Sequence, residues 1–202
     1  MGRGRRVEQW QRLNPPFSIP GGATAARLSG AERTVDRKRR FIGEDLFKVD
    51  TKGRVSIPAS FRRVLAAGDP DWQDGQNPQV VIVYGDEKRN YLECFTIEAI
   101  EKIYDKIEKL PRADKRRRAL QRLYSTHAFT TSVDETGRMV LPAKLRKKIA
   151  LEGEAFFAGT GEAFEIWKPE TYDAEMDKDL TEDDGFDPDV DAAVYLDGDE
   201  EG

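Results

Sequence analysis

Short alternations of apolar and polar residues predict β-strands along much of the chain. Phe41, Leu46 and Phe47 mark a first strand between residues 39 and 48, and residues 54–57 run back after a tight turn. Longer apolar runs predict two strand pairs, residues 80–84 with 91–95 and residues 156–157 with 164–167. The short spacing within each pair indicates hairpins.

Apolar residues at helical spacing predict helices between these strands. A stripe along residues 97–109 indicates an amphipathic helix that Pro111 ends, and a second helix is expected near residues 113–124. Pro58 suits a first helical turn, and Phe61 follows it at helical spacing, with Arg62 and Arg63 expected to point outward. The second predicted helix carries a run of cations, which fits a DNA contact, a solvated face or a subunit contact.

A long internal repeat organises these elements. Residues 49–65 return as residues 133–149, 84 positions later, with seven of seventeen residues identical. A repeat retains residue types that the backbone or a partner needs, so the chain carries two copies of one structural unit. The polar and turn-forming residues kept in both copies are Asp50, Gly53, Arg54, Pro58 and Arg62, repeated as Asp134, Gly137, Arg138, Pro142 and Arg146.

The repeat continues to residues 93–95 and 165–167, which lie only 72 positions apart. The first copy must therefore contain a loop that is 12 residues longer, and the Gly, Pro, Asn and Asp residues of 68–78 place it there.

Composition restricts the function classes. The chain has 202 residues, 35% of them charged, and has neither an apolar run long enough to span a membrane nor a signal peptide, so we expect a cytoplasmic protein. Cys94 is the only cysteine and is expected to be a packed, inert thiol, and His127 a structural residue. No cluster at metal-ligand spacing is present, so no metal or cofactor is predicted. The repeated Asp50 and Asp134 are the only candidate catalytic pair, and such carboxylates more often stabilise a turn, so we do not expect an enzyme.

Charge is distributed unevenly. The net charge is −5, but residues 1–63 carry +9 and residues 169–202 carry −14. The acidic end is expected to be disordered and to act either as a solubilising tail or as an intramolecular competitor for a basic surface. The N-terminal segment is expected to be a basic arm that touches nucleic acid, a dispensable extension, or the product of a start site assigned too far upstream.

The doubled motif resembles the MraZ family of bacterial transcriptional regulators. The first copy reads Asp-x-Lys-Gly-Arg-x-x-x-Pro, and the second lacks only the lysine, where Thr136 replaces Lys52. The resemblance spans about residues 39–176 and implies an α+β fold of two tandem SpoVT/AbrB-like units, with swapped hairpins, short helices and an approximate twofold relation. It also implies a closed ring of subunits that binds short direct repeats upstream of the division and cell-wall gene cluster.

The expected domains are a basic extension (1–38), a first SpoVT/AbrB-like unit (39–110), a connecting helix (111–125), a second unit (126–176) and an acidic tail (177–202). The expected partners are double-stranded DNA and copies of the same chain in the nucleoid, with no membrane.

The candidate DNA-binding residues are Lys52, Arg54, Arg138 and Thr136. The three cations lie beside a glycine and can approach a phosphate or a base edge closely, and Thr136 occupies the position of Lys52 in the second turn. Asp50, Gly53, Pro58, Asp134, Gly137 and Pro142 are expected to shape the two turns. An alternative is that each arginine pairs with the aspartate of its own turn. An AbrB-type antitoxin or a protein-interaction scaffold is the alternative function.

Overall fold

The computed structural model describes residues 39–86 and 88–182, with side chains described up to Met176. The elements in chain order are β1 (Glu44–Lys48), β2 (Arg54–Ser56), α2 (Ala59–Ala67), β3 (Gln79–Val83), β4 (Tyr91–Phe95), α3 (Ile97–Glu108), α4 (Lys115–Gln121), the π-helical turn η1 (Arg122–Thr126), β5 (Ala128–Ser132), β6 (Arg138–Val140), α5 (Ala143–Lys148), β7 (Glu154–Gly159), β8 (Ala163–Trp167) and α6 (Pro169–Glu182). Antiparallel strands and short helices confirm the expected α+β class.

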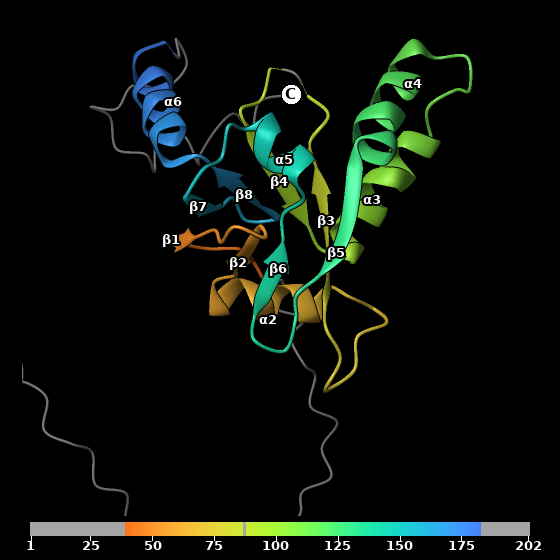
Figure 1. The fold of residues 1–202 in the computed structure, drawn as a ribbon. Coiled ribbons are helices and arrows are strands. Elements are labelled where there is room, and N and C mark those ends of the chain that lie inside the picture. Colours follow the sequence, from red (N-terminus) through yellow and green to blue (C-terminus); the bar gives the residue numbers. More distant parts are fainter. Residues whose placement is uncertain (1–38, 87, 183–202) are drawn as a thin grey trace, which may run out of the picture. The chain divides into compact units, whose positions relative to one another are not determined.

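The strands form a six-stranded sheet and a separate two-stranded ladder. The order in the large sheet is β1-β7-β8-β4-β3-β5, and β2 pairs with β6 in the ladder. In the internal repeat, β1 corresponds to β5, β3 to β7 and β4 to β8. Replacing each strand of the large sheet by its counterpart gives the same order read from the other edge. Strands from both copies are therefore interleaved in one hydrogen-bonded framework (Figure 1).

The predicted reversal between the first strand and residues 54–57 is confirmed, but these two strands do not pair with each other. β1 pairs with β7, and β2 pairs with β6, so neither strand forms a ladder with the other. Backbone hydrogen bonds close the turn between them, from Asp50 N–H to the Arg54 carbonyl (3.0 Å) and from Gly53 N–H to the Asp50 carbonyl (2.9 Å). The chain therefore reverses as expected, but both strands continue into partners from the other copy.

Two pairs of strands place a residue opposite its own repeat counterpart. Val55 lies opposite Met139 in the ladder, and Glu93 lies opposite Glu165 where β4 meets β8. Backbone bonds beside the ladder are reciprocal as well, since Ile57 N–H donates to the Gly137 carbonyl (2.9 Å) and Leu141 N–H to the Gly53 carbonyl (2.8 Å). The two copies are thus related locally by an approximate twofold arrangement of hydrogen bonds.

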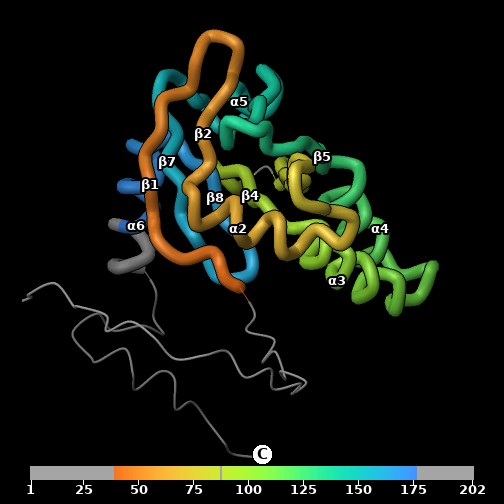
Figure 2. The backbone as a smooth tube through the Cα atoms, turned by 90° about the horizontal axis from the view of Figure 1, so that it is seen from below, coloured from red at the N-terminus to blue at the C-terminus, as the bar shows by residue number. Residues whose placement is uncertain are grey.

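The large sheet is covered differently on its two faces. One face packs against β2, β6, α2 and α5 through buried residues that include Val55, Phe61, Ile82 and Met139. The opposite face packs Val81, Val83 and Phe95 against Ile100 of α3 and, at its margin, against η1. Two views show α3 and α4 beside the end of the large sheet that contains β3 and β5, and α6 beside the end that contains β7 (Figures 1 and 2).

Several predicted elements are confirmed by the structure. The hairpins β3–β4 and β7–β8 are antiparallel, and the predicted helix at 97–109 is α3, which Thr96 caps by accepting a hydrogen bond from Ala99 N–H (3.1 Å). The extra loop at 68–78 lies between α2 and β3, where buried Asp69 accepts hydrogen bonds from Asp71 N–H (3.2 Å) and Gln79 N–H (2.9 Å). The second predicted helix starts at Lys115 and changes to a π-helical turn at Arg122, which sequence periodicity does not indicate.

The N-terminal extension and residues 183–202 of the acidic tail lie outside the described residues. Within the described ranges, no helix combines the length and apolarity needed to cross a bilayer.

Candidate nucleic-acid interface

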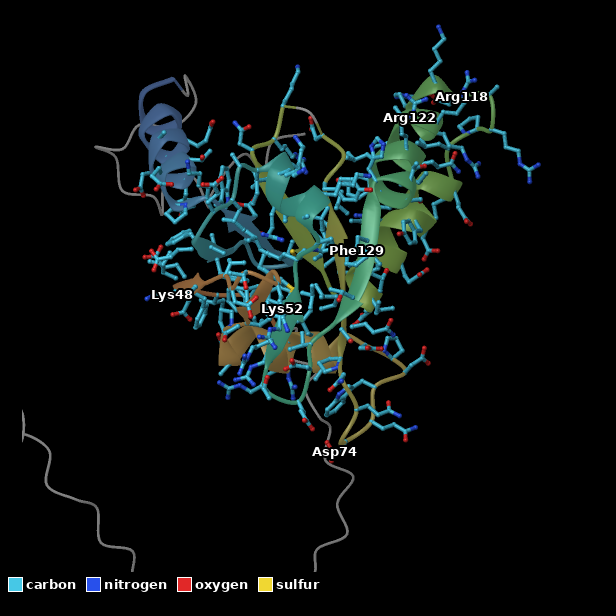
Figure 3. The ribbon with its side chains drawn as sticks, in the orientation of Figure 1. Lys48, Lys52, Asp74, Arg118, Arg122 and Phe129 are labelled. Carbon is cyan, nitrogen blue, oxygen red and sulfur yellow. The ribbon has the colours of Figure 1, made fainter. Side chains whose placement is uncertain are left out.

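The first turn is built around the carboxylate of Asp50. Its Oδ1 accepts hydrogen bonds from the backbone N–H groups of Lys52 and Arg54, both at 2.9 Å, and its Oδ2 accepts one from Arg54 Nε at 2.6 Å. Gly53 has φ +82°, a conformation that side chains disfavour. The Lys52 side chain is exposed and uses none of these bonds, so the aspartate shapes the turn and leaves the ammonium group available (Figure 3).

The second turn repeats this geometry with one change. Asp134 Oδ1 accepts hydrogen bonds from the N–H groups of Thr136 and Arg138, both at 2.9 Å, and from the Thr136 hydroxyl at 2.6 Å. Gly137 again has positive φ, +77°. Among the described residues, Arg138 forms no ion pair within 4.0 Å, in contrast to Arg54. Thr136 therefore completes the turn internally, where Lys52 leaves a cation exposed.

Hydrogen bonding also fixes the charge of both aspartates. The Arg54 backbone N–H, followed by its side chain, holds the pKa of Asp50 below the usual range. The Thr136 hydroxyl and then the Arg138 backbone N–H lower the pKa of Asp134 in the same way. Both carboxylates therefore stay ionised at neutral pH and act as acceptors that hold the turns.

The two motif arginines project from the same side of the β2–β6 ladder. Arg54 lies opposite Val140, and Arg138 lies opposite Ser56, whereas Val55 and Met139 between them are buried. Side chains alternate between the faces of a strand, so Arg54 and Arg138 share the exposed face. Diagonal neighbours of this kind are about 7–8 Å apart at the backbone. The ladder therefore brings together two cations that are 84 positions apart in sequence.

The turn glycines serve a second purpose that sequence reasoning missed. A side chain on Gly53 would collide with the Leu141 carbonyl and approach Arg146, and one on Gly137 would collide with Arg62. Arg62 and Arg146 are repeat counterparts, so each copy lays an arginine across the turn of the other. Arg146 Nε donates to the Leu141 carbonyl (3.1 Å), whereas Arg62 Nε is buried and has no hydrogen-bond partner among the described residues.

The expectation that Arg62 points outward is therefore wrong, although Arg63 is exposed as expected. The arginine retained in both copies was a usable signal, but helical spacing alone could not place it across a turn of the other copy.

Cys94 and His127, for which the sequence predicted structural roles, lie away from these turns. Cys94 is fully buried, and burial raises the pKa of its thiol, which confirms the expected packed cysteine. His127 is half-buried with its ring 5.8 Å from that of Tyr84. Across the described part of the chain, no three His, Cys, Asp or Glu side chains are grouped so that they could hold a metal ion.

Comparisons with known proteins relate this chain to one family. A family model described as "MraZ protein, putative antitoxin-like" matches residues 41–123 and 125–193. The chain is 59% identical over 168 residues to the transcriptional regulator MraZ of Ruegeria pomeroyi, covering 79% of this chain and 96% of the relative. It is 48% identical over 143 residues to the protein of that name from Cereibacter sphaeroides, covering 67% and 84%, and 34% identical over 142 residues to the one from Legionella pneumophila, covering 70% and 88%.

Proposed function

This chain belongs to the MraZ family, and on that premise we propose that it is a DNA-binding transcriptional regulator that grips duplex DNA with its two aspartate-held turns. The observation that carries the proposal is the shared exposed face of Arg54 and Arg138 on the β2–β6 ladder, beside the free ammonium group of Lys52. Arginine can donate two hydrogen bonds to guanine, and lysine can neutralise a phosphate. The relatives are named as regulators and not as enzymes, which agrees with ionised turn carboxylates that serve as hydrogen-bond acceptors.

We propose that the two copies, residues 39–110 and 126–176, are SpoVT/AbrB-like units with swapped hairpins, joined by residues 111–125. The exchange of β1 and β2 into partners from the other copy supports this view. One ladder offers few cations, so tight binding needs several ladders held together. A ring of identical subunits supplies them, and it fits short direct repeats upstream of the division and cell-wall genes. The site of action in this proposal is the nucleoid in the cytoplasm.

The alternative function is that of an antitoxin, which the wording of the matching family model also suggests. The DNA next to the coding gene distinguishes the two. Regularly spaced short repeats upstream favour the regulator, and an adjacent toxin-like reading frame favours the antitoxin.

The direct test is binding of variants to the protein's own upstream DNA. Lys52→Ala keeps every hydrogen bond of the first turn, because only the backbone N–H of Lys52 takes part. We expect it to weaken binding and to reduce the magnitude of the logarithmic salt slope by about 0.9 for each phosphate that is no longer neutralised. Arg54→Ala is expected to abolish specific binding, and Arg138→Ala to weaken it less. Fluorescence anisotropy over a salt series measures all three.

Lys88→Ala is the matched control, because Lys88 is an exposed lysine on the β3–β4 connection, away from the ladder. Circular dichroism and size-exclusion chromatography establish that each variant folds and assembles normally. If Arg54→Ala, correctly folded and assembled, bound the upstream repeats as tightly as the unchanged protein, the assignment of the turns would be wrong.

A further inference from the structure

A second basic surface lies on the opposite side of the large sheet from the two turns. Residues 109–122 contain seven Lys or Arg residues and one acidic residue. α3 packs on the sheet face opposite the β2–β6 ladder, and α4 packs against α3. Figure 3 shows Arg118 of α4 and Arg122, the first residue of η1, well away from Lys52. A duplex resting on the ladder of one subunit is therefore separated by the sheet from the α4 cations of that subunit.

Two of the seven cations are occupied by the chain itself. Arg116 forms an ion pair with Asp114, with Nη2 2.8 Å from Oδ2. Arg117 donates to the carbonyls of Glu108 (3.1 Å) and Leu110 (2.7 Å), so it completes the end of α3. These two arginines have structural roles, and their charge is partly or wholly compensated.

The other five cations have no partner among the described residues, and we call them together the α4 basic face. All are exposed, and within the described residues none makes an ion pair or a side-chain hydrogen bond; they are Lys109, Arg112, Lys115, Arg118 and Arg122. Lys115, Arg118 and Arg122 recur at i, i+3 and i+7, which aligns them along one side of the helix. Glu101, Asp105 and Glu108 on neighbouring α3 are exposed but make no ion pair within 4.0 Å with this face.

The same chain contains a segment of complementary charge. Residues 183–202 hold nine Asp or Glu residues and no Lys or Arg, and they follow α6, which ends at Glu182. Twenty residues can span about 70 Å when extended. A domain of this size has a radius of gyration of about 15 Å, so the segment is long enough to reach any face of the domain that carries it. Its attachment to the chain gives an effective local concentration of order millimolar.

We propose that residues 183–202 bind the α4 basic face of their own chain and shield it from other polyanions. The α4 basic face offers five uncompensated cations, whereas on the ladder Arg54 is already paired with Asp50. An unshielded cation cluster binds any duplex through its phosphates, without regard to sequence. The acidic segment thus lowers sequence-independent DNA binding and leaves the ladder free for the upstream repeats. The contact does not depend on which bases the ladder recognises, so it can be tested apart from the proposed function.

Zero-length carbodiimide cross-linking of the unmodified, full-length protein maps the contact directly. We expect Lys109 and Lys115 to be joined to carboxylates of residues 183–202, and the yield to fall sharply in 0.5 M salt because the pairing is electrostatic, a concentration at which the Debye length is about 4 Å. A mixture of isotopically light and heavy protein separates contacts within one chain from contacts between chains. Links of this segment mainly to Lys52, Lys144 or Lys147, links mainly between light and heavy chains, or no links at all would each overturn the proposal.

A second measurement tests the shielding. The nine acidic residues of the segment are changed to Asn and Gln in the full-length chain, and anisotropy with a duplex that lacks the upstream repeats reports sequence-independent binding. We expect tighter binding and a salt slope that is steeper by up to about 0.9 for each phosphate newly neutralised. Adding Lys115→Gln, Arg118→Gln and Arg122→Gln should remove most of that gain.

The matched control removes three exposed cations elsewhere, with Arg40→Gln, Lys48→Gln and Lys88→Gln in the same neutralised chain. It should keep most of the gain. If neutralising the segment left sequence-independent binding unchanged, or if the control removed as much of the gain as the α4 substitutions, shielding of the α4 basic face would be excluded. Loss of binding to the upstream repeats in Arg54→Ala tests the ladder alone and is unaffected by either result.

Discussion

At the scale of single residues, two features require glycine at the two turns: a positive φ and the lack of room for a Cβ atom. Gly53 and Gly43 both have positive φ, +82° and +95°. A Cβ on Gly53 would collide with the Leu141 carbonyl, whereas nothing lies within 4 Å of the corresponding position on Gly43. The two positions therefore separate the cost of the conformation from the cost of the contact between copies.

Gly53→Ala should destabilise the protein more than Gly43→Ala. The left-handed conformation costs an L-residue about 1–2 kcal/mol, which applies to both variants. Gly53→Ala also has to displace a backbone carbonyl, so we expect a loss of at least about 3 kcal/mol in the free energy of unfolding, since severe strain of this kind produces the large mutational effects. Urea unfolding of both variants measures the difference. Equal losses would show that the turn does not press against the other copy.

At the scale of elements, local patterns predicted which segments are strands and helices but not all of their partners. The stripe of α3 and the Thr96 cap are encoded within a few residues, and so are the β3–β4 and β7–β8 hairpins. β1 and β2 are short, and their alternation of polar and apolar residues predicts a strand without identifying the strand that pairs with it. The turn residues of the site were visible as a repeat, whereas the arginines laid across them depend on contacts between copies that no local pattern records.

The centre of the large sheet contains a cross-strand pair of carboxylates with unequal surroundings. Glu93 lies opposite Glu165, and Glu93 is paired with Arg89 (Oε2 to Nη1, 2.6 Å). Glu165 accepts a hydrogen bond from Trp167 Nε1 (2.9 Å), but burial raises its pKa. The folded protein therefore binds a proton on Glu165 more tightly than the unfolded chain does. Ionised Glu165 lowers stability at neutral pH; this effect is lost as the pH falls through the raised pKa of Glu165 and is gone below about 4.3, the ordinary value.

Glu165→Gln should accordingly raise the free energy of unfolding at pH 7, by about 0.2–1 kcal/mol, and the gain should disappear near pH 4. Glu93→Gln is the matched variant: it removes the same repulsion but also breaks the Arg89 ion pair, so its gain should be smaller or reversed. Denaturant unfolding at pH 7 and pH 4 measures both variants. A Glu165→Gln protein that is less stable than the unchanged protein at pH 7 would contradict this account.

At the scale of the whole molecule, the two copies share one framework of hydrogen bonds. The large sheet interleaves strands from both, and the ladder contains one strand from each. Between α3 and α4 the chain passes through Pro111 and Arg112, which are exposed. This connection can therefore be cut without removing a residue from any of the β-pairings.

Cleavage between α3 and α4 should leave the two fragments bound to each other. The β1–β7, β3–β5, β4–β8 and β2–β6 pairings all cross the cut, so the fragments should elute together in size-exclusion chromatography and separate only in denaturant. A cut placed in the 68–78 loop is the matched control, because it also severs an exposed connection. Fragments that separated in native buffer after cleavage at Arg112 would mean that each copy folds by itself.

Two residues at the centre of the molecule lie opposite their own repeat counterparts, and this arrangement would restrict the sequence of a protein of half this length. The two central positions are the Val55–Met139 pair and the Glu93–Glu165 pair. In a dimer of identical half-chains, the residue at each position would face a copy of itself, so any substitution would change both members of the pair. Joining the halves releases that restriction, so valine now faces methionine in the ladder, and a lysine in one turn corresponds to a threonine in the other. Fusion thus allows the two turns to carry different side chains, so a charge at one turn no longer requires the same charge at the other.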